Sequence, residues 1–390
     1  MKRIYLDYAS NTPLLPEVRG AMAPFLDGEF GNPSALHQLG RRASRAIAEA
    51  REKVAALIGA SAEELIFVSC GTEANNLALK GLAGAHEKKG RHLIVSKIEH
   101  QSVLYAARRL TRQGFRVTHV GTDPNGRVDP EEVRRAIEPD TILISIALAN
   151  GEIGTLEPIQ EIATLAKQKG ILMHTDAVAS CGSLPIDADA LGVDALSLAA
   201  NQFYGPVGAA ALYLRRGIRI VPLCDGGGQE EGRHSGTENV PAIVGMGKAA
   251  ELARSELGRR RTHLKALRDE LEIGLLSYEG VVRNGHPTER LPGYLSLSVA
   301  GIEAESLLLA LDTEGVCVSS GSACNAKAMK PSYVLQAIGL DPHWAQGTLL
   351  FTVGLSTQRE EIATVLEVFP KVLKTLRRVS AGDLMMKETR

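Results

Sequence analysis

The feature that most constrains the fold is a series of short apolar runs, rich in β-branched residues, which alternate with segments of helical periodicity. The runs lie at residues 64–70, 92–96, 115–120, 141–148, 171–177 and 209–214. Strands that alternate with helices in this way pair in parallel and are covered by the helices on both faces. The sequence therefore predicts an α/β fold built on a mostly parallel sheet.

The last third of the chain has a different pattern. Residues 241–276 form one long segment of helical periodicity that is charged on one side and apolar on the other, which is typical of a helix that links two domains. The strands and helices that follow predict a smaller α+β unit. We expect a large domain over residues 15–255 and a small domain formed by residues 1–14 and 256–390, and a chain of 390 residues is long enough for both.

Composition and charge exclude several classes of function. The net charge is −1, so neither nucleic acid nor a membrane surface is expected as a partner. No apolar run approaches the roughly 20 residues that a membrane-spanning helix needs, and the first residues lack the apolar core of a secretory signal. The five cysteines show no C-x-x-C spacing. We therefore expect reduced thiols, a cytoplasmic location and no metal site.

Three polar residues stand where strands or turns end. Thr72 belongs to a Gly-Thr turn that opens a helix, which is typical of a phosphate cup but also of a simple helix cap. Asp176 ends a buried strand, where ligands of open α/β sheets collect, and its carboxylate suits a protonated ring nitrogen or a structural hydrogen bond. His100 follows another strand end, where it either stacks on a flat ligand or has a structural role.

Two loops carry further candidates. Residues 226–240 form a Gly-rich loop that contains Thr237, and they read equally well as a surface turn. Residues 318–332 are small and polar and contain Cys324. A structural cysteine lies in an apolar run, as Cys317 does, so Cys324 is expected to be exposed and reactive.

A Gly-Pro turn between two apolar runs raises a question. Turns of this kind present a reactive side chain to a cofactor in many α/β enzymes. Here the residues just before the turn are Asn201 and Gln202, and neither of them is a nucleophile or a base. The reactive position of the turn therefore lacks a reactive group.

Taken together, these strings resemble the cysteine desulfurase family, pyridoxal-phosphate (PLP) enzymes of the class V aminotransferase group. The resemblance runs nearly from end to end and rests on strings such as FGNPSALHQLGRRA, FVSCGTEANNLALKG, FYGPVG, GGGQEEGRHSGTENV and VSSGSACNAKAMKPS. It implies a fold-type I PLP-transferase-like homodimer with a mostly parallel seven-stranded sheet in the large domain.

The resemblance also implies roles for single residues. In that family a lysine forms a Schiff base with PLP, and a loop cysteine takes the sulfur of the substrate cysteine as a persulfide while alanine is released. Cys324 matches the loop cysteine, His100 the histidine that stacks on the ring, and Asp176 the partner of the pyridine nitrogen. Thr72 matches a phosphate contact, and Thr237 matches the phosphate contact that comes from the other subunit.

The chain departs from the family where the chemistry takes place. Asn201 and Gln202 replace the histidine and the lysine of the family. Further family side chains, a serine, a glutamine, an asparagine and two arginines, are replaced by Ala199, Ala179, Gly151, Leu355 and His234. Glutamine has no amine and cannot act as an acid or base. We therefore expect a degenerate PLP site with no covalently bound cofactor, in which PLP binds at most non-covalently.

Three hypotheses follow. The first is a sulfur-transfer or iron–sulfur assembly protein in which Cys324 receives a persulfide from a donor protein and passes it to an acceptor, or ligates iron on a scaffold. The second is an enzyme that binds PLP or another phosphate ligand non-covalently and uses another base. The third is a non-catalytic subunit that pairs with itself or with an active desulfurase. The alternative to all three is that Cys324 is a surface thiol without a function.

Overall fold

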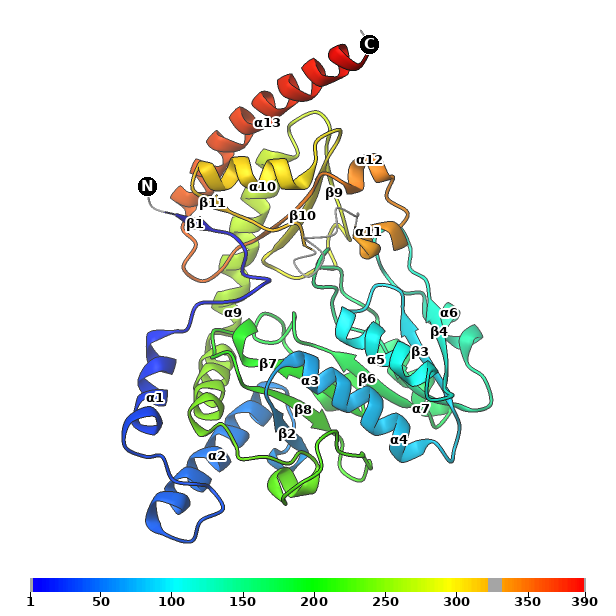
Figure 1. Cartoon of the computed structure of the whole chain (residues 1–390), viewed down its shortest axis with the longest axis vertical. Helices are drawn as coiled ribbons and strands as arrows, with labels where there is room; N and C mark the ends of the chain where they lie inside the picture. The colour runs from blue at the N-terminus through cyan, green and yellow to red at the C-terminus, as the bar shows by residue number, and fades with distance from the viewer. Residues whose placement is uncertain (1–2, 322–331, 389–390) are drawn as a thin grey trace.

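A computed structural model describes residues 3–321 and 332–388 of the chain (Figure 1). Cys324 therefore lies outside the described residues. No helix in the described part is both long and apolar enough to cross a membrane.

The centre of the structure is a seven-stranded sheet. Its strands, in spatial order, are β2 (Leu65–Val68), β8 (Ala210–Leu214), β7 (Ala195–Ala199), β6 (Leu172–Asp176), β5 (Thr141–Ser145), β3 (His92–Ser96) and β4 (Arg116–Val120). β8 is antiparallel to both of its neighbours, and the other pairs are parallel. The prediction of a mostly parallel seven-stranded sheet in an α/β fold is confirmed.

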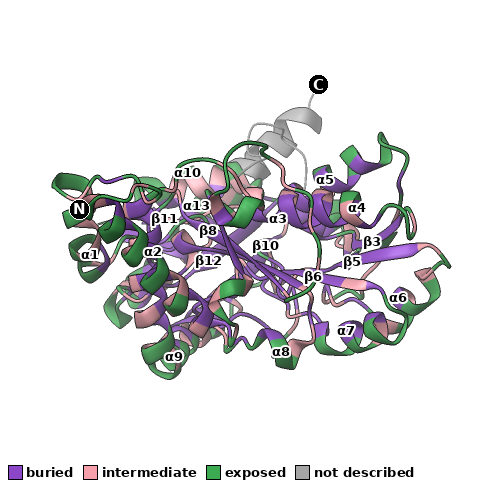
Figure 2. Ribbon diagram, turned by 90° about the horizontal axis from the view of Figure 1, so that it is seen from below, coloured by how far each residue is buried: buried purple, intermediate pink, exposed green. Residues whose placement is uncertain are grey.

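Helices cover both faces of this sheet, and its strands apart from the edge strand β4 form a buried layer (Figure 2). One face packs against α1 (Pro16–Asp27), α2 (Gln38–Leu57), α6 (Pro130–Ala136), α7 (Ile159–Gln168), α8 (Ala188–Leu191) and the first half of α9 (Val240–Leu275). The other face packs against α3 (Gly71–Asn76), the π-helical turn Leu77–Gly81, α4 (Leu82–His86) and α5 (Gln101–Thr111). Burial on both faces explains why the strands read as continuous apolar runs.

A second core surrounds the remaining strands. β12 (Thr348–Thr352), β10 (Tyr294–Val299) and β9 (Val281–Arg283) form an antiparallel sheet, and β1 (Ile4–Tyr5) pairs with β11 (Val316–Cys317). The second half of α9, α10 (Ala304–Thr313) and α13 (Arg359–Glu388) pack with these strands, and α11 (Tyr333–Ala337) and α12 (Pro342–Ala345) lie at the side (Figure 1). α9 covers almost the same residues as the predicted linking helix. The domain boundary near residue 255 stays a prediction.

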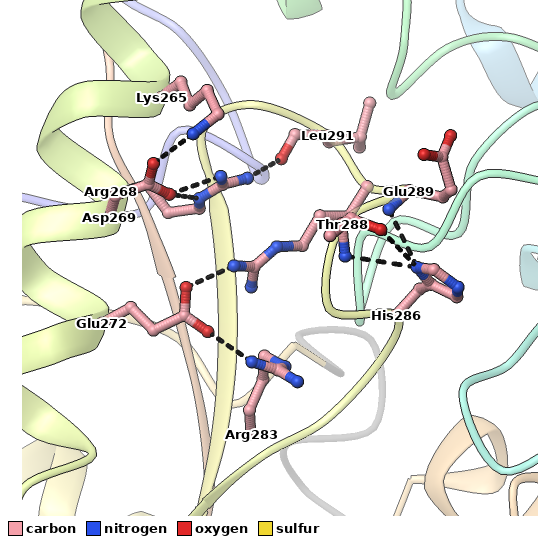
Figure 3. Close-up of polar contacts among 10 residues, drawn as sticks. Lys265, Arg268, Asp269, Glu272, Arg283, His286, Thr288, Glu289 and Leu291 are labelled. Atoms are coloured by element: carbon pink, nitrogen blue, oxygen red, sulfur yellow. Dashed lines mark hydrogen bonds and ion pairs between the residues drawn. The ribbon is translucent and has the colours of Figure 1, made fainter.

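A buried charge network ties α9 to the second core (Figure 3). Glu272 on α9 accepts hydrogen bonds from Arg283 Nη1 at 3.0 Å and from Arg290. Glu272 and Arg290 are both buried. Burial opposes ionisation of Glu272, but the hydrogen bonds from the two arginines outweigh it, so the pKa of this carboxyl is lowered. The pair is therefore charged at neutral pH.

Further hydrogen bonds connect α9 to the segment that follows β5. Arg268 on α9 donates from Nη1 to the carbonyl of Leu291 at 3.1 Å (Figure 3). The backbone of Leu291 in turn donates to the carbonyl of Gly154 at 2.8 Å, and Leu156 donates to the carbonyl of Glu289 at 3.0 Å. The loop after β9 thus joins α9 to the segment that follows β5, which borders the candidate site.

Candidate active site

Several of the predicted site residues lie at one edge of the seven-stranded sheet. Parallel strands present their carboxyl ends together, and ligands of open α/β sheets bind outside that edge. Asp176 is the last residue of β6, Ala199 the last of β7, and His100 follows β3 as the N-cap of α5. Thr72 lies in the first turn of α3, which follows β2. The fold therefore places these residues on one side of the sheet.

A chain of hydrogen bonds links Asp176 to His100. Asp176 is buried, its Oδ2 accepts from Asn75 Nδ2 at 2.6 Å, and its Oδ1 accepts from the Val178 backbone at 2.9 Å. Asn75 Nδ2 also lies 2.9 Å from Ser102 Oγ, which is 2.7 Å from His100 Nδ1. The structure thus joins the two predicted residues through Asn75 and Ser102. Sequence reasoning missed both, although Asn75 lies one helical turn after Thr72.

Glu99 is a further polar residue beneath this site that sequence reasoning missed. It is buried, and its Oε1 accepts from Ser96 Oγ at 2.5 Å and from the Ala147 backbone at 3.1 Å. Its Oε2 has no hydrogen-bond partner among the described residues. Burial, to which the charge of Asp176 adds, raises the pKa of Glu99 to about 8. The sequence offered one indication of this role, since Glu99 directly precedes the predicted site residue His100.

We expect Glu99→Gln to change the pH dependence of stability. Because the folded-state pKa is raised above that of the unfolded chain, the stabilising contribution of Glu99 is complete below about pH 4.5 and is lost as the pH rises through about 8. Relative to wild type, the variant should gain roughly 2–4 kcal/mol in free energy of unfolding between pH 5 and pH 9. Urea unfolding at both pH values measures this, with the exposed Glu49→Gln as control. Parallel stability curves for wild type and Glu99→Gln would contradict it.

The predicted phosphate cup lies at the start of α3. Thr72 is exposed there, and a Cβ atom at the preceding Gly71 would approach Val178 Cγ2 to 2.8 Å and Ala199 Cβ to 3.6 Å. The turn therefore needs glycine and lies directly beside Ala199, where the family has a serine. Thr237 is exposed on the segment before α9.

The Asn201–Gln202 turn is held by the N-terminal segment of the chain. Residues Ala200–Gln202 form a 3₁₀ turn after β7, and Gln202 Nε2 donates to the carbonyl of Ala9 at 2.9 Å. The carbonyl of Asn201 accepts from Thr12 Oγ1 at 2.8 Å and from the Thr12 backbone at 3.1 Å. Gln202 thus has a structural hydrogen bond, and its neutral amide offers no proton-transferring group.

The substrate side of the site is apolar where the family has an arginine. Leu355 is half-buried, and its backbone donates to Tyr204 Oη at 2.7 Å. A Cβ atom at Gly151 would lie 3.9 Å from Ala179 Cβ, so these two departures from the family face each other. The described residues at this rim therefore provide few of the polar groups that the resemblance implies.

The floor of the site fits the ring of PLP. The buried carboxylate of Asp176 suits a protonated ring nitrogen, and Asn75 Oδ1 is a buried atom without a hydrogen-bond partner among the described residues. His100 is exposed beside this floor. The residues that would hold the ring are present, although Gln202 occupies the position at which the family has the lysine that binds PLP.

Comparisons with known proteins agree with the fold. A model of the aminotransferase class-V family matches residues 4–365. A cysteine desulfurase IscS from Dictyoglomus turgidum is 49% identical over 385 residues, 97% of each chain. Another from Methanosarcina thermophila is 46% identical over 379 residues, 97% of this chain and 94% of the relative. The solved structure of a NifS-like protein, 36% identical, superposes with a TM-score of 0.90 and covers 96% of this chain and 100% of its own.

These matches overturn one expectation, that the chain holds no covalently bound cofactor. Relatives named cysteine desulfurase, with nearly half of their residues identical along the whole chain, point to PLP as the cofactor of this protein. The chain belongs to the aminotransferase class-V family.

Proposed function

We propose that this protein is a PLP-binding sulfur-transfer protein of the cysteine desulfurase type that carries sulfur on Cys324. The observation that carries the proposal is the buried Asp176 carboxylate with its hydrogen-bond chain to His100, which supports the ring of PLP. The role of Cys324 in the proposal rests on the sequence, because the segment around it matches the loop that carries the family's persulfide cysteine.

The retained residues have distinct tasks in this proposal. PLP, when bound, supplies the electron sink that chemistry at the Cα atom of an amino acid requires. The carboxylate of Asp176 keeps a proton on the ring nitrogen, and Asn75 and the Val178 backbone fix its orientation. His100 covers the ring. Thr72 and Thr237 bind phosphate, the latter from the partner of a homodimer.

The substrate side of the site differs from that of the family, and this difference determines which molecule can supply the sulfur. Gln202 cannot take a proton from the substrate's Cα atom at any pH, and Leu355 cannot pair with its carboxylate. We propose that sulfur therefore arrives mainly as a persulfide on a second protein, such as an active desulfurase. The Cys324 thiolate attacks the terminal sulfur of the donor, the donor cysteine leaves as a thiolate, and the new persulfide passes to an acceptor such as an iron–sulfur scaffold in the cytoplasm.

Persulfide labelling of cysteine variants tests this function. The full-length protein is incubated with an active desulfurase and cysteine, and the bound sulfur is located by mass spectrometry of alkylated peptides. We expect about one sulfur per chain, on Cys324, and its loss in Cys324→Ser. Cys70→Ser removes an exposed thiol from the described part of the chain and serves as the matched control. Equal labelling of wild type and Cys324→Ser would show that Cys324 is not the carrier.

A further inference from the structure

Three potential metal ligands of different chemistry meet at the turn into α3. The ligand atoms of Glu73, Cys224 and His234 all lie within 4.8 Å of one another. His234 Nε2 is 2.8 Å from Glu73 Oε1. Glu73 and His234 are half-buried, whereas Cys224 is exposed, so the group is open to solvent on one side. Glu73 follows β2 and the other two follow β8, so only folding brings them together.

The chemistry of this set favours one class of ion. A thiolate, an imidazole and a carboxylate are ligands of Zn²⁺ and related divalent transition metals, whereas Mg²⁺ and Ca²⁺ take oxygen ligands. Zn²⁺ binds these ligands at about 2.0–2.3 Å, so ligands of a tetrahedral site lie roughly 3.3–3.8 Å apart. The three ligand atoms lie within 4.8 Å of one another, and His234 Nε2 and Glu73 Oε1, which are 2.8 Å apart, must separate to admit the ion.

The oxygen supplied by Glu73 is held in place. Its other carboxylate oxygen, Oε2, accepts from the Ser69 backbone and from Ser69 Oγ, both at 2.6 Å. This leaves Oε1 directed at His234. Hydrogen bonds that orient a ligand in this way are typical of the outer shell of metal sites.

The loop that carries Cys224 and His234 is anchored as well. The buried Glu230 accepts from Arg51 Nη1 at 2.8 Å and from the Phe67 backbone at 2.9 Å. Arg233 Nη1 donates to the carbonyl of Glu63 at 3.1 Å. Two points of the loop beside His234 are thus fixed to the residues around β2, so His234 needs little ordering on binding.

We propose that Glu73, Cys224 and His234 form a binding site for a divalent transition-metal ion, with Zn²⁺ as the best match, and that a water molecule completes its coordination. Binding replaces the proton of the Cys224 thiol and any proton on His234 Nε2, and both protons go to solvent. No electron transfer is involved. Glu73 directly follows Thr72, so the ion would lie beside the proposed phosphate cup.

Cobalt substitution tests the site through a signal that a plain ion pair lacks. The purified full-length protein, in the Cys324→Ser background, is stripped with a chelator and titrated with Co²⁺. We expect about one Co²⁺ per chain, a thiolate-to-cobalt charge-transfer band, and displacement of Co²⁺ by Zn²⁺. Loss of an outer-shell partner alone costs 10–100-fold in affinity, so Cys224→Ser should abolish the band and lower affinity by about 100-fold or more.

Two further variants make the result decisive. Cys70→Ser removes an exposed thiol near the same turn that is not among the three ligands, and it should keep the band and the affinity. His234→Ala should keep a weak thiolate signal but bind loosely. Absence of the band in wild type would show that Glu73 and His234 form an ion pair only, and an unchanged band in Cys224→Ser would show that another thiolate binds the ion; either result would overturn the proposal.

Discussion

Asp176→Asn is expected to lower the affinity of the protein for PLP by about 10–100-fold. The substitution removes the negative charge opposite the ring nitrogen, and a charge-assisted hydrogen bond of this kind is worth about 1.5–3 kcal/mol. It also sets an amide against Asn75 Nδ2 and the Val178 backbone, which both donate to the carboxylate at present. Equilibrium dialysis with PLP measures the change.

The matched control for this prediction is Asp129→Asn. Asp129 also accepts a backbone hydrogen bond, from Glu131 at 2.9 Å, but it caps α6 at the surface. Its replacement should leave PLP affinity unchanged. Unfolding curves of both variants separate a local effect from a loss of folded protein. PLP affinity of Asp176→Asn within about twofold of wild type would show that this carboxylate does not support the ring.

Glu272→Ala is expected to lower the free energy of unfolding by about 3–5 kcal/mol. The change leaves Arg290, with a side chain 4% exposed, and Arg283 without their shared carboxylate. Breaking one partner of a buried ion pair is far more costly than the pair is stabilising, because it leaves a buried charge uncompensated. Because the pKa of Glu272 is lowered, its contribution is present above about pH 4.5 and is lost as the pH falls.

A surface pair provides the comparison for Glu272. Glu131 pairs with Arg134 on α6, and both side chains are 58% exposed. Glu131→Ala should therefore cost at most about 1 kcal/mol. The double variant Glu272→Met/Arg290→Met, which removes two opposite charges together, should recover part of the stability lost in Glu272→Ala. Equal effects of Glu272→Ala and Glu131→Ala in urea unfolding would contradict the account.

The strands and the long helix of this fold were predictable from local pattern. Buried parallel strands give continuous apolar runs, and α9 keeps its helical periodicity through two cores. Asp176 and His100 were predictable for a related reason, since strand ends of one sheet meet at one edge. These features depend on neighbours in the sequence or on the known geometry of sheets.

Other parts of the site depend on contacts that the sequence does not reveal. Asn75 reaches Asp176 at the end of β6, and Glu73 reaches His234 in the loop after β8. Both contacts form only when α3 takes its place in the fold. The cysteines show no C-x-x-C spacing, and Glu73 and Cys224 of the proposed metal site lie far apart in the chain, so the sequence pattern predicted no metal site. The expectation about the cofactor was wrong because it rested on single replaced side chains, whereas relatives that match along the whole chain are named cysteine desulfurase.

The source of the sulfur tests the central claim most directly. The PLP-loaded protein is supplied either with free cysteine alone or with a donor desulfurase that carries a persulfide, and sulfur on Cys324 is measured together with alanine. Since Gln202 cannot move the Cα proton, sulfur on Cys324 is predicted with the donor, and neither sulfur nor repeated alanine release is predicted with cysteine alone. Continuous alanine release from free cysteine, with loading of Cys324 in the absence of the donor, would contradict the account.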